Sequence, residues 1–315
     1  MFRIMEEEGD MDFSQLQYVK KLAQGAESSI YYGIYRDRDV AVKVFKEIDD
    51  EREDRELHAE RLRKQFDQEK KILSRLRHPN VVEIVAACRQ TSVYCILTEF
   101  MSEGSLRAYL NRFERSKTLL PFEIVLVIAL EIAKGMEYVH SQGIIHRDIK
   151  PENILIDQGF RLKIADFGVS CEAKGCDCKD VGTFRWMAPE MITRKKYSRK
   201  VDVYSFGLLL NEMVSGSAPF GDLSPVQVAY GVANKNLRPE ISKGCPEFMR
   251  LLIERCWSKN PKKRPEFSEI VNVLEKFLGF HEDNEGNVKM LQQCVKQDHH
   301  KKGLFHLIQK LCIFP

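Results

Sequence analysis

Three polar side chains with the chemistry of a metal site lie at fixed spacings near the middle of the chain. Asp148 is followed by Asn153 five positions later and by Asp166 thirteen positions after that. Two short apolar runs, 154–156 and 162–164, separate Asn153 from Asp166, with the turn-forming Asp-Gln-Gly between them. This pattern predicts a β-hairpin. A hairpin places the residue before its first strand beside the residue after its last, so Asn153 and Asp166 should be neighbours.

An amide oxygen beside a carboxylate forms a site of hard oxygen ligands, which suits Mg²⁺ carrying phosphate groups. Asp148, on the loop before the hairpin, can reach the same space as a free carboxylate. This arrangement resembles the catalytic core of the protein kinases, whose H-R-D-x-x-x-x-N and D-F-G motifs read here as 146–148 with Asn153 and as 166–168. The resemblance implies ATP with Mg²⁺, or Mn²⁺ as its substitute, with Asn153 and Asp166 as metal ligands. Asp148 would orient and deprotonate the substrate hydroxyl.

The composition excludes several other classes of protein. The chain has 315 residues, 43% hydrophobic and 30% charged, as expected for a globular protein with a substantial core. A formal charge of +3 leaves no basic excess for nucleic acid. No apolar run approaches the length of a membrane span, and a secretory signal is absent. Nine scattered cysteines suggest reduced thiols, so we expect a cytoplasmic protein, with nuclear access left open.

The first third of the chain predicts an antiparallel meander of short strands followed by a long helix. β-like runs begin at Gln17, alternate with polar turns, and include the run 40–44. An apolar stripe predicts a helix over 51–76. Two further strands are expected at 81–86 and 93–98.

Lys43 lies in Val-Ala-Val-Lys, very close to the V-A-I-K motif of the third kinase strand. A lysine in an apolar strand needs an ionic partner, and the resemblance implies a glutamate on the following helix. Glu69 is the better match by apolar register, four residues before Leu73, and Glu60 is its competitor. In the family this pair positions the α and β phosphates of ATP.

The glycine-rich loop that covers the ATP phosphates in kinases is depleted here. Against G-x-G-x-x-G-x-V, residues 23–30 read A-Q-G-A-E-S-S-I, so only Gly25 remains. The loss of two glycines restricts the backbone, which bears on ATP affinity but not on ATP binding as such. The resemblance implies further ATP contacts at Leu22, Gly25, Ala26, Glu27, Ser28, Ile30, Ala41, Thr98, Glu99, Met101 and Leu155. Of these, Glu99 and Met101 would read the adenine edge through their backbone, and Thr98 would guard the pocket behind it.

Two residues favour serine and threonine over tyrosine as acceptors. Lys150, two residues after Asp148, is typical of the serine/threonine subclass, and its ammonium can reach the transferring phosphoryl group. Thr183, in Gly-Thr-Phe-Arg-Trp-Met, can hydrogen-bond Asp148 and Lys150.

The stretch from Asp166 to Glu190 resembles the activation segment of a kinase and ends in Ala-Pro-Glu. Its hydroxyl side chains are Ser170 and Thr183. A phosphate on either could pair with Arg147 and order the segment, and the sequence leaves this open. Outside the segment, the resemblance implies that Arg264 pairs with Glu190 and that Asp202 accepts hydrogen bonds from the backbone of the catalytic loop.

The whole pattern predicts an α+β chain with the bilobal kinase fold. We expect a flexible acidic segment over 1–15, a kinase domain over 16–278 and a tail over 279–315. Within the domain, the small lobe would cover 16–98, the hinge 99–104 and the large lobe 105–278, with ATP between the lobes. The elements W-M-A-P-E-M, D-V-Y-S-F-G and R-C-W are most similar to the tyrosine-kinase-like group, and within it to the plant Raf-like serine/threonine kinases.

The predicted function is transfer of the γ-phosphate of ATP to serine or threonine of protein substrates, within a signalling cascade. One alternative is a pseudokinase scaffold, whose support is the depleted glycine loop. Another is a membrane-tethered adaptor acting through the tail, where apolar residues between 304 and 311 share one helical face beside lysines and could contact a membrane surface or a partner groove. Such a stretch more often packs on its own domain or stays disordered.

Overall fold

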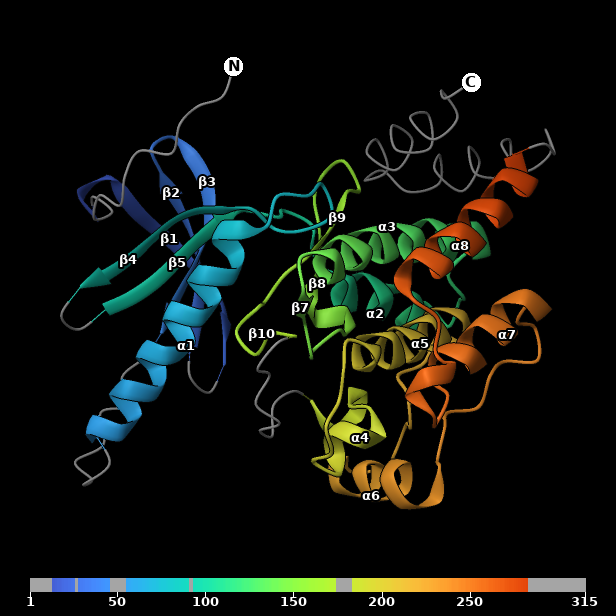
Figure 1. Cartoon of the computed structure of the whole chain (residues 1–315). Coiled ribbons are helices and arrows are strands. Elements are labelled where there is room, and N and C mark those ends of the chain that lie inside the picture. The colour runs from blue at the N-terminus through green and yellow to red at the C-terminus, as the bar shows by residue number, and fades with distance from the viewer. Residues whose placement is uncertain (1–12, 26–27, 46–54, 91–92, 174–182, 283–315) are drawn as a thin grey trace. The chain divides into compact units, whose positions relative to one another are not determined.

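The computed structural model divides into two compact units (Figure 1). The first unit consists of residues 1–77 and 82–101, and the second of residues 78–81 and 102–315. The residues that the structure describes are 13–25, 28–45, 55–90, 93–173 and 183–282.

The first unit is built on a five-stranded antiparallel sheet. Its strands are β1 (Leu16–Gln24), β2 (Ser28–Tyr35), β3 (Arg38–Phe45), β4 (Ile84–Gln90) and β5 (Val93–Glu99), preceded by the 3-10 turn η1 (Phe13–Gln15). The strand order is β1-β2-β3-β5-β4. Side chains alternate between the faces of a strand, so Val40 and Val42 of β3 are buried together, and Val42 lies directly opposite the buried Leu97 of β5. The predicted meander is confirmed.

One helix, α1 (Arg55–Arg75), runs alongside this sheet within the first unit (Figure 1). Its apolar stripe buries Leu62 and Phe66 almost completely. The helix predicted over 51–76 is confirmed where the structure describes it, and 51–54 lie outside the described residues.

The fourth strand starts later than predicted. It begins at Ile84, whereas the prediction covers 81–86. Val81 instead forms an isolated parallel bridge with Ile164. Both residues belong to the second unit, which includes 78–81. Because this short stretch pairs within the second unit, the strand of the first unit begins only after it.

The second unit is mainly helical, and α3 (Phe122–Ser141) and α5 (Lys200–Ser215) are its most buried helices. The others are α2 (Leu106–Ser116), α4 (Pro189–Ile192), α6 (Pro225–Lys235), α7 (Glu247–Cys256) and α8 (Phe267–Glu282), with the 3-10 turns η2 (Pro151–Asn153), η3 (Phe184–Trp186) and η4 (Pro261–Lys263). The helix α3 is apolar on nearly all sides and packs against α8. A Cβ on Gly207 of α5 would lie 2.8 Å from the Cβ of Cys256, so glycine permits the close packing of α5 and α7. Among the described helices, none is long and apolar enough to cross a membrane.

Short strands connect the loops of the second unit. β8 (Ile154–Ile156) pairs with β9 (Leu162–Ile164), which confirms the predicted hairpin, and β6 (Gly104–Ser105) extends this sheet. β7 (Ile144–Ile145) pairs with β10 (Cys171–Glu172). The antiparallel sheet of one unit and the helices of the other together give the predicted α+β class.

The cysteines differ in part from the prediction of reduced thiols. Cys88, Cys95, Cys245 and Cys256 are free and buried. Cys171 is disulfide-bonded, so the prediction is wrong for this residue.

Several predictions concern parts of the chain outside the described residues. These are most of the acidic lead-in, up to residue 12, and the loop residues Ala26 and Glu27. Residues 283–315, with the predicted amphipathic helix, also lie outside them. The first four tail residues, 279–282, continue the helix α8.

Candidate active site

The loop 146–153 is fixed at its start by Asp202 of α5. The Asp202 carboxylate accepts the backbone N–H groups of His146 and Arg147, at 2.9 and 2.7 Å, and lies 2.8 Å from Nε2 of His140. Burial of Asp202 opposes its ionisation, but these hydrogen bonds outweigh burial and lower the pKa of the carboxyl. The carboxylate thereby holds Arg147 in a left-handed conformation, with φ +71°. The predicted role of Asp202 as acceptor is confirmed.

Asp148, Lys150 and Thr183 form one hydrogen-bonded group in the second unit. Nζ of Lys150 lies 2.6 Å from Oδ2 of Asp148 and donates to Oγ1 of Thr183 at 2.8 Å. The hydroxyl and the backbone N–H of Thr183 both donate to Oδ1 of Asp148, at 3.1 and 3.2 Å. The Asp148 side chain is 9% exposed, so these donors fix its orientation in a largely buried place.

Asn153 closes the loop onto Asp148. Its Nδ2 donates to the carboxylate and to the backbone oxygen of Asp148, both at 2.9 Å. With the amide nitrogen used in this way, the amide oxygen is the atom that can ligate a cation. The backbone oxygen of Asn153 accepts the N–H of Ala165 at 2.9 Å, which brings the next residue, Asp166, to the same end of the hairpin.

The donor set of Asn153 and Asp166 fits a divalent cation that shares its coordination with phosphate. An amide oxygen and a carboxylate are the hard ligands that such ions prefer. Among the described residues there is no group of three His, Cys, Asp or Glu side chains that could hold a metal ion by itself. Asp166 adopts φ +62°.

The turn that carries Asp166 is held by its neighbours. Phe167 is fully buried, with its ring 4.8 Å from that of His146 in an edge-on contact. Nε2 of His146 lies 3.1 Å from the backbone oxygen of Ala165. His146 therefore connects the loop that carries Asp148 to the turn that carries Asp166.

In the first unit, Lys43 of β3 pairs with Glu69 of α1. Its Nζ donates to both carboxylate oxygens of Glu69, at 2.9 and 2.8 Å, and Glu69 is only 2% exposed. The competitor Glu60 instead pairs with Lys64 at 2.7 Å on the outer side of the helix, and this hydrogen bond lowers the pKa of Glu60. The choice of Glu69 over Glu60 is confirmed.

The other nucleotide-contact residues predicted in the first unit lie on the strands around Lys43. Ile30 is directly opposite Lys43, and Ala41 is opposite Thr98. The backbone N–H of Gly25 donates to the oxygen of Ser28 at 2.8 Å, which closes the depleted loop on itself. Leu22 is on β1, Glu99 ends β5, and Met101 follows it and is buried. Leu155 lies in β8 of the second unit.

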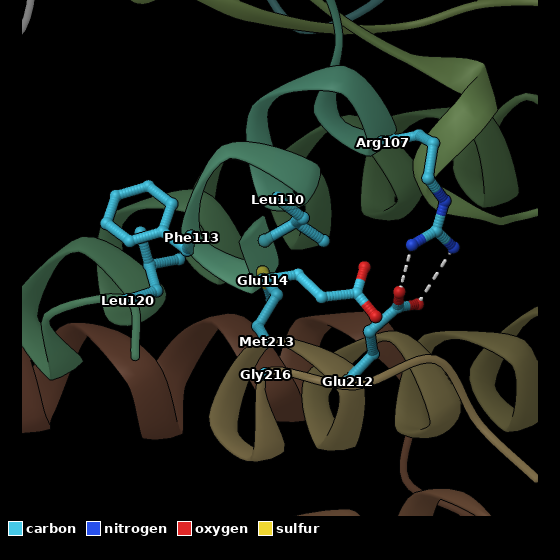
Figure 2. Close-up of a pocket in the computed structure, with 8 residues that line it drawn as sticks. All are labelled: Arg107, Leu110, Phe113, Glu114, Leu120, Glu212, Met213 and Gly216. Atoms are coloured by element: carbon cyan, nitrogen blue, oxygen red, sulfur yellow. Dashed lines mark hydrogen bonds and ion pairs between the residues drawn. The ribbon is translucent and has the colours of Figure 1, made fainter. Parts of the chain in front are cut away.

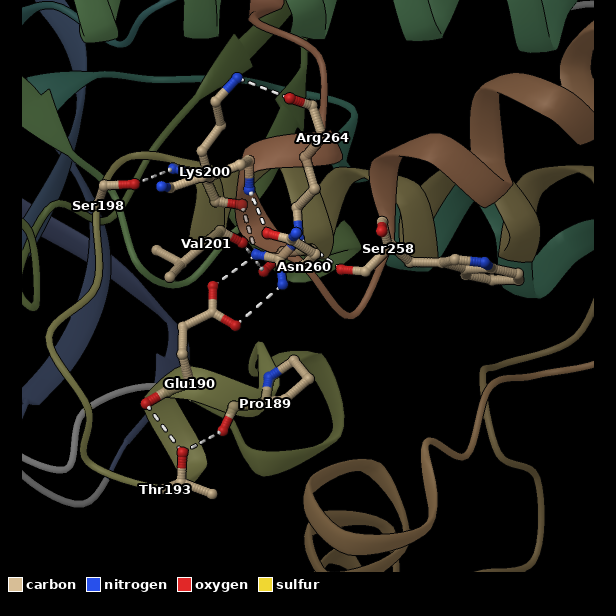
Figure 3. Close-up of polar contacts among 12 residues, drawn as sticks. Pro189, Glu190, Thr193, Ser198, Lys200, Val201, Ser258, Asn260 and Arg264 are labelled. Carbon is tan, nitrogen blue, oxygen red and sulfur yellow. Dashed lines mark hydrogen bonds and ion pairs between the residues drawn. The ribbon is translucent and has the colours of Figure 1, made fainter.

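A buried ion pair anchors the end of the predicted activation segment (Figure 3). Nη1 and Nη2 of Arg264 donate to the two carboxylate oxygens of Glu190, at 2.6 and 2.9 Å. Arg264 also donates to the backbone oxygen of Lys200 at 2.9 Å, and Nζ of Lys200 donates to the backbone oxygen of Arg264 at 2.7 Å. The predicted pair of Glu190 and Arg264 is confirmed.

Two further contacts have no signal in the sequence. Arg107 of α2 donates through Nε to Glu152 at 2.7 Å, and through both terminal nitrogens to Glu212 of α5 (Figure 2). Arg107 and Glu212 line a small pocket between α2 and α5, to which none of the predicted site residues contributes. Arg147 donates to the hydroxyl of Tyr197 at 3.0 Å. The partners lie 105 and 50 residues apart, beyond the reach of any local pattern.

Comparison with known proteins gives a consistent result. Residues 16–274 match the family model of protein tyrosine and serine/threonine kinases. The serine/threonine/tyrosine-protein kinase HT1 of Arabidopsis thaliana is 51% identical over 86% of this chain and 68% of its own length. The serine/threonine-protein kinase STY17 of the same plant is 38% identical over 86% of this chain and 46% of its own length. The mitogen-activated protein kinase kinase kinase 13-B of Xenopus laevis is 31% identical over 84% of this chain and 26% of its own length, so the chain spans less than half of these two.

Proposed function

Since the chain belongs to the protein tyrosine and serine/threonine kinase family, we propose that it transfers the γ-phosphate of ATP to serine and threonine hydroxyls of protein substrates. Kinases of this family use ATP and a divalent metal, and their substrates are proteins. The relatives are consistent with a tyrosine-kinase-like kinase of the Raf type. The observation that carries the proposal is the hydrogen-bonded group of Asp148, Lys150 and Thr183.

Asp148 has the surroundings of the residue that receives the substrate hydroxyl. Its carboxylate is oriented by Lys150, Thr183 and Asn153 and is largely buried. A carboxylate held in this way accepts the hydrogen bond of an incoming hydroxyl and takes its proton as the phosphoryl group transfers. Lys150, 2.6 Å from Asp148, supplies a positive charge beside the transferring group.

Asn153 and Asp166 would hold the divalent metal, which we take to be Mg²⁺, with Mn²⁺ as a substitute. When bound, the metal neutralises negative charge on the phosphates. In the first unit, the Lys43 ammonium, fixed by Glu69, would bind the α and β phosphates.

The preference for serine and threonine rests on Lys150 and Thr183. Their side chains bond to each other and to Asp148. If Asp148 receives the substrate hydroxyl, a lysine and a threonine hydroxyl would lie beside that acceptor. The pseudokinase alternative is not favoured, because Lys43, Asp148, Asn153 and Asp166 are all present. The substrate proteins and a place in a signalling cascade are part of the same proposal, supported by the kinase relatives. A cytoplasmic location also belongs to it; the four free cysteines support that location, and the disulfide of Cys171 does not.

The test is transfer of labelled phosphate from ATP with Mg²⁺ to a generic basic protein, followed by phosphoamino-acid analysis. Asp166→Asn serves as the inactive control, because it removes a proposed metal ligand and keeps the size of the side chain. Phosphoserine or phosphothreonine formed by the parent and lost in the control is the expected result. Phosphotyrosine as the main product would contradict the specificity, and absence of transfer by folded protein with Mg²⁺ or Mn²⁺ would contradict the activity.

A further inference from the structure

The guanidinium of Arg147 is held by acceptors from two different parts of the second unit. Nε donates to the backbone oxygen of Val169 at 2.5 Å, and Nη1 donates to the hydroxyl of Tyr197 at 3.0 Å. Val169 directly follows the Asp-Phe-Gly motif, and Tyr197 lies in the loop between α4 and α5. Arg147 is only 7% exposed, so its guanidinium has lost most of its contact with water. Hydrogen-bond acceptors of the protein must therefore replace that water.

The position of the Arg147 side chain bears directly on Asp148, the next residue. Arg147 occupies the left-handed region, with φ +71°, which is costly for a residue with a side chain and persists only where the surroundings hold it. Asp202 holds its backbone N–H. Tyr197 and Val169 hold the guanidinium at the end of its side chain. The Arg147 side chain therefore links the Tyr197 hydroxyl to the catalytic loop, which carries Arg147, and to the start of the activation segment, which carries Val169.

The hydroxyl side chains of the activation segment are already engaged. Ser170 is fully buried, and its Oγ donates to the backbone oxygen of His146 at 3.2 Å. Thr183 donates to Asp148 and accepts from Lys150. The sequence has no other serine, threonine or tyrosine between Asp166 and Glu190. A phosphate on either hydroxyl would have to break the contacts that build the site.

We propose that Tyr197 is a positioning residue that keeps Arg147 in its active orientation without a phosphate on the activation segment. The inference rests on the proposed kinase activity and adds its regulation. In many kinases an arginine of this loop is ordered by a phosphorylated residue. Here the phenol hydroxyl of Tyr197 supplies an acceptor from within the chain. The protein should therefore be active as an unphosphorylated chain, and that activity should depend on a single hydroxyl group far from the acceptor site in sequence.

The test compares Tyr197→Phe with Tyr204→Phe in the full chain after phosphatase treatment. Each variant removes one phenol oxygen, but the buried hydroxyl of Tyr204 has no hydrogen-bond partner among the described residues. We expect the parent to remain active after the treatment. Tyr197→Phe should lower kcat about tenfold, or about 1.4 kcal/mol in activation free energy, with the KM for ATP within about twofold of the parent. Tyr204→Phe should leave both constants unchanged.

Amide hydrogen exchange gives a readout that does not depend on turnover. In Tyr197→Phe, exchange at Arg147 and Ser170 should be faster than in the parent, at a temperature where both proteins are folded. Unchanged kcat and unchanged exchange in Tyr197→Phe would overturn the proposal, as would loss of parent activity on phosphatase treatment. If the parent transfers no phosphate under any condition, the kinase activity itself fails, and the exchange comparison alone decides whether Tyr197 holds Arg147.

Discussion

Replacement of Arg107 by methionine removes the cation from a buried ion pair and leaves the aliphatic part of the side chain. In the parent, the guanidinium contacts both carboxylate oxygens of Glu212 through two nitrogens and Glu152 through Nε (Figure 2). The Glu212 side chain is 3% exposed and that of Arg107 is 21% exposed. In the variant, the Glu212 carboxylate keeps its burial and loses this cation.

The size of the effect follows from that burial. Breaking a buried ion pair by removing one partner costs about 3–5 kcal/mol. Because a fifth of the Arg107 side chain is exposed, the lower end of that range applies, or about 3 kcal/mol. For a unit of this size, such a loss lowers the unfolding temperature by about 6–12 °C. A second variant that replaces Arg107 by methionine and Glu212 by leucine should recover most of the loss, because no uncompensated charge remains buried.

The loss should also depend on pH. Burial raises the pKa of the Glu212 carboxyl, and the hydrogen bond from Arg107 opposes that rise. Without Arg107 the pKa rises further, so the folded variant keeps a proton that the unfolded chain releases above the ordinary glutamate pKa. Stability of the variant is therefore highest at low pH and falls as pH rises from the ordinary glutamate range through the raised value. The parent shows the same sign over a narrower range.

Differential scanning calorimetry at about pH 5.5 and about pH 8 measures both effects. Arg112→Met is the matched control, because Arg112 is exposed on the same helix and forms no ion pair within the described residues. We expect Arg107→Met to unfold at a lower temperature than Arg112→Met, with the larger difference at the higher pH. Equal unfolding temperatures, or a larger difference at the lower pH, would refute the reasoning.

Three further changes test the site and its support. Glu69→Gln removes the negative partner of Lys43, so kcat/KM for ATP should fall about tenfold or more. Glu60→Gln, which removes the partner of Lys64 instead, should leave kcat/KM unchanged. Steady-state kinetics with varied ATP measures both. Asp202→Asn replaces an acceptor of two backbone N–H groups, so kcat should fall about a hundredfold with the KM for ATP little changed; equal kcat in parent and variant would count against the anchoring role. Gly207→Ala places a Cβ 2.8 Å from that of Cys256, so the free energy of unfolding, measured with urea, should fall by about 1–3 kcal/mol. An unchanged free energy of unfolding would mean that α5 and α7 can move apart without cost.

The sequence alone determined those features that depend on neighbours along the chain. The hairpin of β8 and β9 follows from two apolar runs and one turn, and its pairing brings Asn153 and Ala165 into contact. The apolar register of α1 also selected Glu69 over Glu60, because helix geometry alone places one of them on the buried side. Longer-range pairs such as Glu190 with Arg264 came from resemblance to a family and not from any local pattern.

Only the tertiary structure decided which distant side chains meet. Arg107 with Glu212 and Arg147 with Tyr197 are brought together by the packing of helices and loops that are far apart in sequence. Helix and strand periodicities relate residues only a few positions apart, so they cannot predict contacts between residues 105 or 50 positions apart. The late start of β4 at Ile84 has the same origin, since Val81 pairs with Ile164 and both belong to the second unit. Local sequence thus predicts which helices and strands form, and the free energy of tertiary packing determines where each begins and which side chains it brings into contact.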